Sequence, residues 1–178
     1  MKNPFAIIIL FVLLIFVAWF YYEHYKLLQA PQVPSSTPAI GTRIKDSNCT
    51  AQGSLPDKQC TPGAVFEQAT VADICVSGYT KTVRNVPGSL KHKVYAEYGV
   101  THHSPGEYEV DHLIALELGG SNDIANLWPE PAEPQPGFHQ KDEVENYLHQ
   151  EVCSGRMDLR KAQALIANDW LDVYKQMN

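Results

Sequence analysis

The segment YEVDHLIALELGGSNDIANLWPE, residues 108–130, decides the fold of this chain. It opens with an alternating apolar run that contains Asp111-His112, crosses Gly119-Gly120, and reaches Asn126-Leu127-Trp128 fourteen residues after His112. The alternation predicts a strand over 108–116, and Asn126-Leu127-Trp128 predicts a second strand beyond the glycine turn. Together they predict a hairpin that carries an aspartate, a histidine and an asparagine.

The sequence on either side of this hairpin predicts several helices. Apolar residues recur every three or four positions from His139 to the Ser154-Gly155 stop, and again from about Asp158 to Gln176. Ser89 is a suitable N-cap for a short helix that ends at Gly99. Residues 69–86 mix β-branched with polar residues and predict one or two short strands. The expected fold class is therefore α+β.

The N-terminal residues are the clearest compositional feature. Residues 5–22, FAIIILFVLLIFVAWFYY, carry no charge. As a helix they would span about 27 Å, close to the ~30 Å hydrocarbon core of a bilayer. No small-x-small cleavage site follows, so we expect an uncleaved transmembrane anchor over 1–28 rather than a cleaved signal peptide. Lys2 and the terminal amine favour a cytoplasmic N-terminus, which puts the remaining chain in the periplasm or outside the cell.

The rest of the chain has room for one further domain. Residues 29–44 are rich in proline and serine and predict an extended linker, and 45–178 predict the folded domain. The formal net charge of −6 does not by itself indicate a nucleic-acid partner. A local basic face can coexist with such a charge.

Four cysteines fit export: Cys49, Cys60, Cys75 and Cys153. None belongs to a CxxC pair, which disfavours a zinc ribbon. In an oxidising compartment an even number of cysteines favours disulfides. Of the three possible pairings we prefer Cys49–Cys60 with Cys75–Cys153, because the second ties the start of the domain to its C-terminal helices. Four free thiols in a cytosolic protein would require the anchor prediction to be wrong.

The order Asp-His, Gly-Gly, Asn-Leu-Trp and helix resembles the HNH endonucleases, whose ββα-metal motif combines a hairpin with a helix. The resemblance extends to exported HNH-like bacterial proteins with a similar KDEVENYLHQEVCSGRMDLRKAQ tail, and it covers roughly residues 49–174. It implies an HNH-type hairpin-plus-helix core with additional helices, preceded here by the N-terminal transmembrane helix.

The resemblance implies a role for each polar residue of the motif. His112 would be the general base, because a neutral imidazole with a pKa of about 6.5 can take a proton from water near neutral pH. Asp111 would give the metal a hard anionic oxygen. Asn126 would brace the hairpin and orient His112 by hydrogen bonding. His139, at the head of the following helix, falls where the family places its second metal ligand.

This ligand set implies one divalent metal ion and no organic cofactor. A carboxylate with an imidazole can accept Mg, Mn, Ni or Zn, so the metal identity stays open. The proline-rich loop between Asn126 and His139 leaves the second ligand open as well. Asp142, Glu143 or Glu145 could take that place.

A local basic segment predicts where nucleic acid would bind. No acidic residue occurs between Asp73 and Glu97, whereas Arg84 and Lys91 do, and each could contact a phosphate. Lys141, near the expected metal, is a third candidate. No recognition-helix pattern is present, so little base specificity is expected.

These features predict a membrane-anchored, metal-dependent endonuclease with little sequence specificity, for which DNA is a more strongly expected substrate than RNA. Each residue also has a simpler interpretation: Asp111-His112 as a strand end, Asn126 as a turn cap, and the basic segment as a solvated face. The alternative function is a non-catalytic extracytoplasmic binding module that retains an HNH-like fold. A structural zinc protein is a third possibility.

Overall fold

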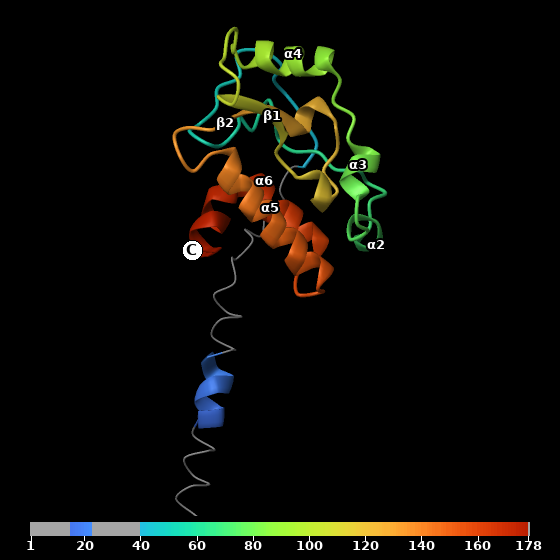
Figure 1. Cartoon of the computed structure of the whole chain (residues 1–178), viewed down its shortest axis with the longest axis vertical. Helices are drawn as coiled ribbons and strands as arrows, with labels where there is room; N and C mark the ends of the chain where they lie inside the picture. The colour runs from blue at the N-terminus through green and yellow to red at the C-terminus, as the bar shows by residue number, and fades with distance from the viewer. Residues whose placement is uncertain (1–14, 23–39, 178) are drawn as a thin grey trace, which may run out of the picture. The chain divides into compact units, whose positions relative to one another are not determined.

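The computed structural model describes residues 15–22 and 40–177 (Figure 1). Residues 15–22 are helical and belong to a different compact unit from residues 40–177. Most of the expected anchor over 1–28, and most of the linker over 29–44, lie outside the described residues. Among the helices in the described ranges, none has the length and apolar character that a membrane crossing requires.

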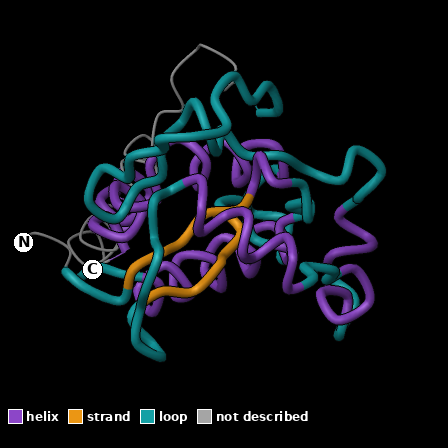
Figure 2. Tube along the Cα trace, turned by 90° about the horizontal axis from the view of Figure 1, so that it is seen from above, coloured by secondary structure: helices purple, strands orange, loops and turns teal. Residues whose placement is uncertain are grey.

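Residues 40–177 have an α+β fold with one two-stranded antiparallel sheet and several helices. Figure 2 shows the two strands among helical segments. In chain order the elements are α2 (Val71–Ile74), α3 (Tyr79–Val83), α4 (Gly88–Glu97), β1 (Tyr108–His112), the 3-10 turns η1 (Leu116–Leu118) and η2 (Ile124–Asn126), β2 (Leu127–Pro131), α5 (Phe138–Cys153) and α6 (Leu159–Met177).

The predicted hairpin is present. β1 pairs with β2 so that Asp111 lies opposite Trp128 and His112 opposite Leu127. β1 ends at His112, four residues earlier than expected, because the chain then turns into the buried segment that leads to η1. All five residues of β2 are buried, so this strand is enclosed on both faces.

The Gly119-Gly120 turn folds the chain back against Ile114 and Ala115, at the beginning of the same loop. Gly119 has a φ of 76°, in the left-handed region that favours glycine. A Cβ on Gly120 would lie 1.7 Å from the carbonyl oxygen of Ile114, so no other residue fits there without moving the backbone. This close approach packs the loop between His112 and β2 tightly against itself.

The two C-terminal helices pack against each other and supply much of the core. The buried positions of α5 recur every three or four residues, as an amphipathic helix requires: Phe138, Lys141, Val144, Leu148 and Val152. In α6, residues 162–167 are buried without interruption. The helix is broken at Asp169 (φ −164°, ψ 89°), so the expected continuous helix to Gln176 has a kink. Beyond it, Trp170 is fully buried and donates a 3.0 Å hydrogen bond to the Ser54 carbonyl.

The strands expected within 69–86 are not present; this segment forms the helices α2 and α3. Thr70 and Asp73 form a capping box at the start of α2, in which each side chain binds the backbone of the other residue. Gly78, with a φ of 86°, precedes α3. Local capping thus outweighs the β-branched composition on which the strand prediction was based.

Both preferred disulfides are confirmed. Cys49 is bonded to Cys60 and Cys75 to Cys153, with Cα atoms 6.0 Å and 5.7 Å apart. The first closes a short loop near the start of the folded part. The second joins the end of α2 to the end of α5, across 78 positions of sequence.

Candidate active site

His112, the last residue of β1, is held in a defined orientation. Its Nε2 lies 3.1 Å from Oδ1 of Asn122. The Asn122 amide cannot be reversed, because its Nδ2 donates to the Val83 carbonyl (2.7 Å) and its Oδ1 accepts from the Asn85 amide (3.1 Å). Nε2 of neutral His112 is therefore the protonated nitrogen that donates to Asn122, and Nδ1 keeps the lone pair.

The Nδ1 atom of His112 is chemically available as a base. It is buried and makes no hydrogen bond with the described part of the protein. Burial lowers the pKa of His112, and the positive charge of Arg84 lowers it further against the opposing effect of Asp111. The imidazole is consequently neutral near pH 7, the form that can accept a proton.

Asn126 braces the hairpin, but its side-chain hydrogen bonds do not reach His112 among the described residues. Its Oδ1 accepts from the amides of Ile114 (2.9 Å) and Ala64 (3.3 Å), and its Nδ2 donates to the carbonyls of Ile114 and Ser121 (2.9 Å each). The prediction that it braces the hairpin is therefore correct. The prediction that it orients His112 is wrong, since Asn122 makes that hydrogen bond.

Asp111 is paired with the buried ammonium group of Lys141. Nζ of Lys141 lies 2.6 Å from Oδ2 of Asp111 and 2.8 Å from the His112 carbonyl oxygen. It also donates to Glu145 and lies 3.6 Å from Glu130. A lysine ammonium thus occupies the place of a cation beside Asp111.

The pKa values of this cluster follow from burial and mutual charge. Burial opposes the charge on both partners, but the Lys141–Asp111 attraction outweighs it, so the pKa of Asp111 falls and that of Lys141 rises. Burial, reinforced by the Asp111 charge, raises the pKa of Glu145 to about 8. Burial also raises the pKa of Glu130. Glu145 therefore holds a proton near neutral pH, and burial opposes ionisation of Glu130 as well.

Lys141 was predicted to contact nucleic acid, and this prediction is corrected. The side chain is fully buried and is bound by the carboxyl groups and by a backbone carbonyl, so it presents no charge at the surface. The sequence could not reveal this, because Lys141 meets Asp111 across 30 positions of sequence.

His139, the second expected metal ligand, is exposed at the start of α5 with its ring against that of Phe138. It interacts electrostatically with Glu109 and Asp142, whose pKa values are raised by burial and by repulsion from Asp111. No hydrogen bond or ion pair joins it to Asp111 among the described residues.

The donor atoms of Asp111, His112 and His139 do not gather as a ligand group. In the described ranges, the one set of three or more such donors within 4.8 Å of each other is Cys75, His149 and Cys153. The predicted site at Asp111 and His139 therefore does not fit a metal ion as it is arranged, and no step of a reaction is assigned to one.

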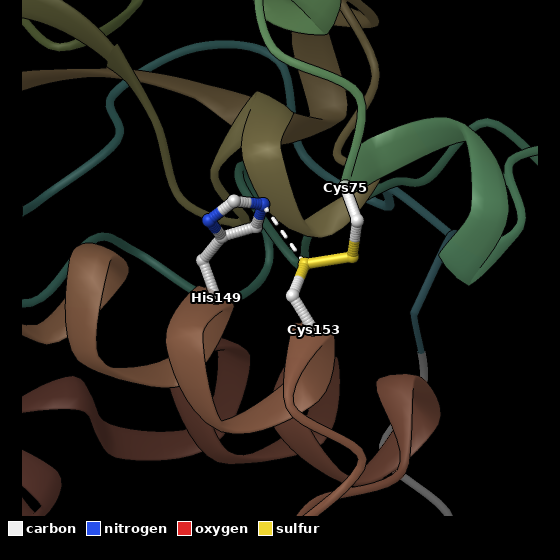
Figure 3. A group of neighbouring side chains, drawn as sticks. All are labelled: Cys75, His149 and Cys153. Carbon is white, nitrogen blue, oxygen red and sulfur yellow. Dashed lines mark hydrogen bonds between the residues drawn. A yellow bond between two sulfur atoms is a disulfide. The ribbon is translucent and has the colours of Figure 1, made fainter.

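The set Cys75, His149 and Cys153 has the donor types of a metal site (Figure 3). In this structure its two sulfurs are joined as a disulfide, and disulfide sulfurs lack the thiolate charge that binds metals. The sequence predicted a disulfide between these two cysteines, and nothing in it singled out His149.

The predicted phosphate-binding residues separate into two groups. Arg84 is exposed and follows α3, between the two residues that bind Asn122, so it lies at the edge of the His112 environment. Lys91 is exposed on α4 and takes no part in the network around His112. Of the three predicted phosphate-binding residues, Arg84 is the one that offers an exposed positive charge near His112.

The chain matches no family model, no curated protein and no solved structure. The functional interpretation of the site therefore depends on the geometry and chemistry of its own residues.

Two residues of that chemistry were missed in the sequence. Asn122 lies in the Gly-Gly-Ser-Asn turn, where an asparagine is more often a turn former. Glu130 was assigned to the proline-rich loop after Trp128 and given no role, whereas it lies within β2. Its position opposite Glu109 in the sheet, over a buried lysine, becomes visible only once α5 is placed.

Proposed function

We propose that this chain is an HNH-type endonuclease that hydrolyses phosphodiester bonds with His112 as general base. DNA is the proposed substrate in preference to RNA. The main observation in support is that the hydrogen bonds around His112 allow one neutral tautomer, the one protonated at Nε2. Asn122 fixes Nε2 as the donor, so the lone pair on Nδ1 is free to take a proton from the attacking water.

The surroundings of His112 support this role. Asn122 holds the ring, and the lowered pKa keeps it neutral. Arg84 places a positive charge within electrostatic reach, suitable for the oxygens of a phosphate. Because Nδ1 is covered, the proposal requires the water to enter with the substrate.

The resemblance implies that a divalent ion supplies charge stabilisation at the phosphate. Glu109 and Asp142 interact electrostatically with Asp111 and His139, and all four carry oxygen or imidazole donors of the required type. Because these donors are not gathered into a site, the cleavage assay itself must show whether activity depends on a metal. The ion tested would be Mg or Mn first, then Ni or Zn.

We also propose that the enzyme acts outside the cytoplasm, held by an anchor within 1–28. The two disulfides support this placement, because such bonds persist in oxidising compartments.

A non-catalytic binding module is the second candidate, and one observation favours it. Asp111 is neutralised by Lys141, and Asn126 is fully used by backbone hydrogen bonds. Two of the motif's polar residues therefore act to stabilise the fold.

The test is plasmid nicking by the detergent-solubilised full chain, with Mg, Mn or EDTA. His112→Gln is the decisive variant, because its amide nitrogen can still donate to Asn122 while the base at Nδ1 is lost. We expect a loss of about 100-fold or more in rate. The wild-type rate should rise with pH through a midpoint below 6.5, because the neutral ring is the active form.

His92→Gln, at an exposed position of α4, is the matched control and should cleave like the wild type. Equal cleavage by His112→Gln would overturn the role of the base. Absence of wild-type cleavage with every metal, together with retained DNA binding, would favour the binding module.

A further inference from the structure

The two disulfides differ in their accessibility. Cys49 and Cys60 are buried, whereas Cys75 and Cys153 are both exposed. Thiol–disulfide exchange requires a thiolate to reach one of the sulfur atoms. A reductant in solution therefore meets Cys75–Cys153 first.

An imidazole lies directly beside this exposed disulfide. His149 precedes Cys153 by four residues on α5, so both side chains lie on the same face of the helix. Its Nε2 lies 3.3 Å from Sγ of Cys153 and 3.1 Å from the carbonyl oxygen of Ile74, the residue before Cys75. Figure 3 shows the ring directed at the sulfur.

We propose that Cys75, His149 and Cys153 form a redox-gated site for a thiophilic divalent metal, with Zn²⁺ as the best fit. A dithiol opens it: its thiolate forms a mixed disulfide with one cysteine and breaks the Cys75–Cys153 bond, and its second thiol then closes the reductant's own disulfide. Two electrons and two protons pass to the protein, giving two thiols. Zn²⁺ then displaces both thiol protons to solvent and binds the two thiolates. Nε2 of His149 donates to the Ile74 carbonyl in the oxidised form, so its proton must move to Nδ1 through solvent before Nε2 can bind the metal.

The surrounding fold keeps the three donors together after reduction. Ile74 and Val152, the neighbours of the two cysteines, are buried at 2% and 1% exposure and hold both backbone segments in the core. The Cα atoms are 5.7 Å apart. Nε2 of His149 and Sγ of Cys153 are already near the separation of about 3.6 Å that tetrahedral zinc requires.

The site would be open. Three protein ligands leave the fourth position of zinc to water or to another ligand. The proposed metal site shares no residue with the surroundings of His112. Its test is therefore independent of the test of the proposed nuclease activity.

The test uses the full chain in detergent, treated with a phosphine reductant that is then removed without air. Native thiol counting should first find two thiols, from Cys75 and Cys153. Co²⁺ should then give sulfur-to-metal charge-transfer absorption, which reports sulfur ligands only, and Zn²⁺ should displace it at one equivalent. The oxidised chain should give no such band.

Variants distinguish a metal site that includes His149 from metal binding by two neighbouring thiols alone. His149→Ala should weaken Co²⁺ and Zn²⁺ binding by tenfold or more while still exposing two thiols. Cys75→Ser/Cys153→Ser should abolish the band, and Cys49→Ser/Cys60→Ser, if it folds, should retain it. Equal affinity in His149→Ala, or no sulfur-ligated band in the reduced wild type, would overturn the proposal.

Discussion

Among single residues, two asparagines perform the two roles that the sequence assigned to Asn126 alone, bracing the hairpin and orienting His112. Asn126 satisfies four backbone groups and holds the loop closed. Asn122 instead fixes the tautomer of His112. Their side chains are chemically identical, so only the partners that folding provides distinguish a bracing residue from a positioning residue.

Replacing Asn126 with alanine should destabilise the fold strongly. The change leaves buried amides and carbonyls without partners, at about 1–3 kcal/mol each, so we expect a loss of about 4 kcal/mol or more in the free energy of unfolding. Urea denaturation followed by circular dichroism measures it. Asn122→Ala, at a partly exposed position, is the control and should lose much less. Equal losses would contradict the bracing role.

Glu145 should make stability depend on pH. Its pKa is raised from 4.5 to about 8 by burial and by Asp111, so the folded chain binds a proton that the unfolded chain releases between those values. Stability should therefore fall as pH rises from 5 to 9, by on the order of 2–4 kcal/mol from this group.

Glu145→Gln resembles the protonated form and should flatten the profile over that window. Thermal unfolding midpoints from pH 5 to 9 would measure this effect, with the exposed Glu143→Gln as a control that keeps the wild-type slope. A variant with an unchanged slope would show that Glu145 is ionised at neutral pH.

At the scale of elements, the glycine turn between η1 and β2 is the least replaceable feature. Gly120→Ala would put a methyl group 1.7 Å from the Ile114 carbonyl oxygen, so the backbone must move. We expect a loss of about 3 kcal/mol or more in unfolding free energy, measured by chemical denaturation. Gly88→Ala, where nothing lies within 4 Å of the added atom, is the matched control and should be nearly neutral.

The elements that the sequence predicted correctly are those with a local signal. Alternation and the Gly-Gly pair predicted the hairpin, and apolar spacing predicted α5 and α6. The segment 69–86 was assigned wrongly because a two-residue capping box is a weaker pattern than its β-branched composition. Lys141 could not be placed, since its burial depends on how α5 meets β1.

At the scale of the whole molecule, the Cys75–Cys153 bond links early and late parts of the folded chain. On the chain-entropy model, a closed loop of this length is worth about 4.5 kcal/mol. Cys75→Ala/Cys153→Ala should lose most of that in non-reducing guanidinium titrations, and little of the loss should come from packing because both residues are exposed. Unchanged stability would show that the bond constrains the unfolded state very little.

The hydrogen bond from Trp170 to the Ser54 carbonyl spans 116 positions, and Lys58 likewise binds the carbonyl oxygen of Asn168. Two hydrogen bonds thus tie the loops around residues 54–58 to α6, near its kink. During synthesis from the N-terminus, these two hydrogen bonds cannot form until residue 170 has left the ribosome, so this part of the core is completed among the last.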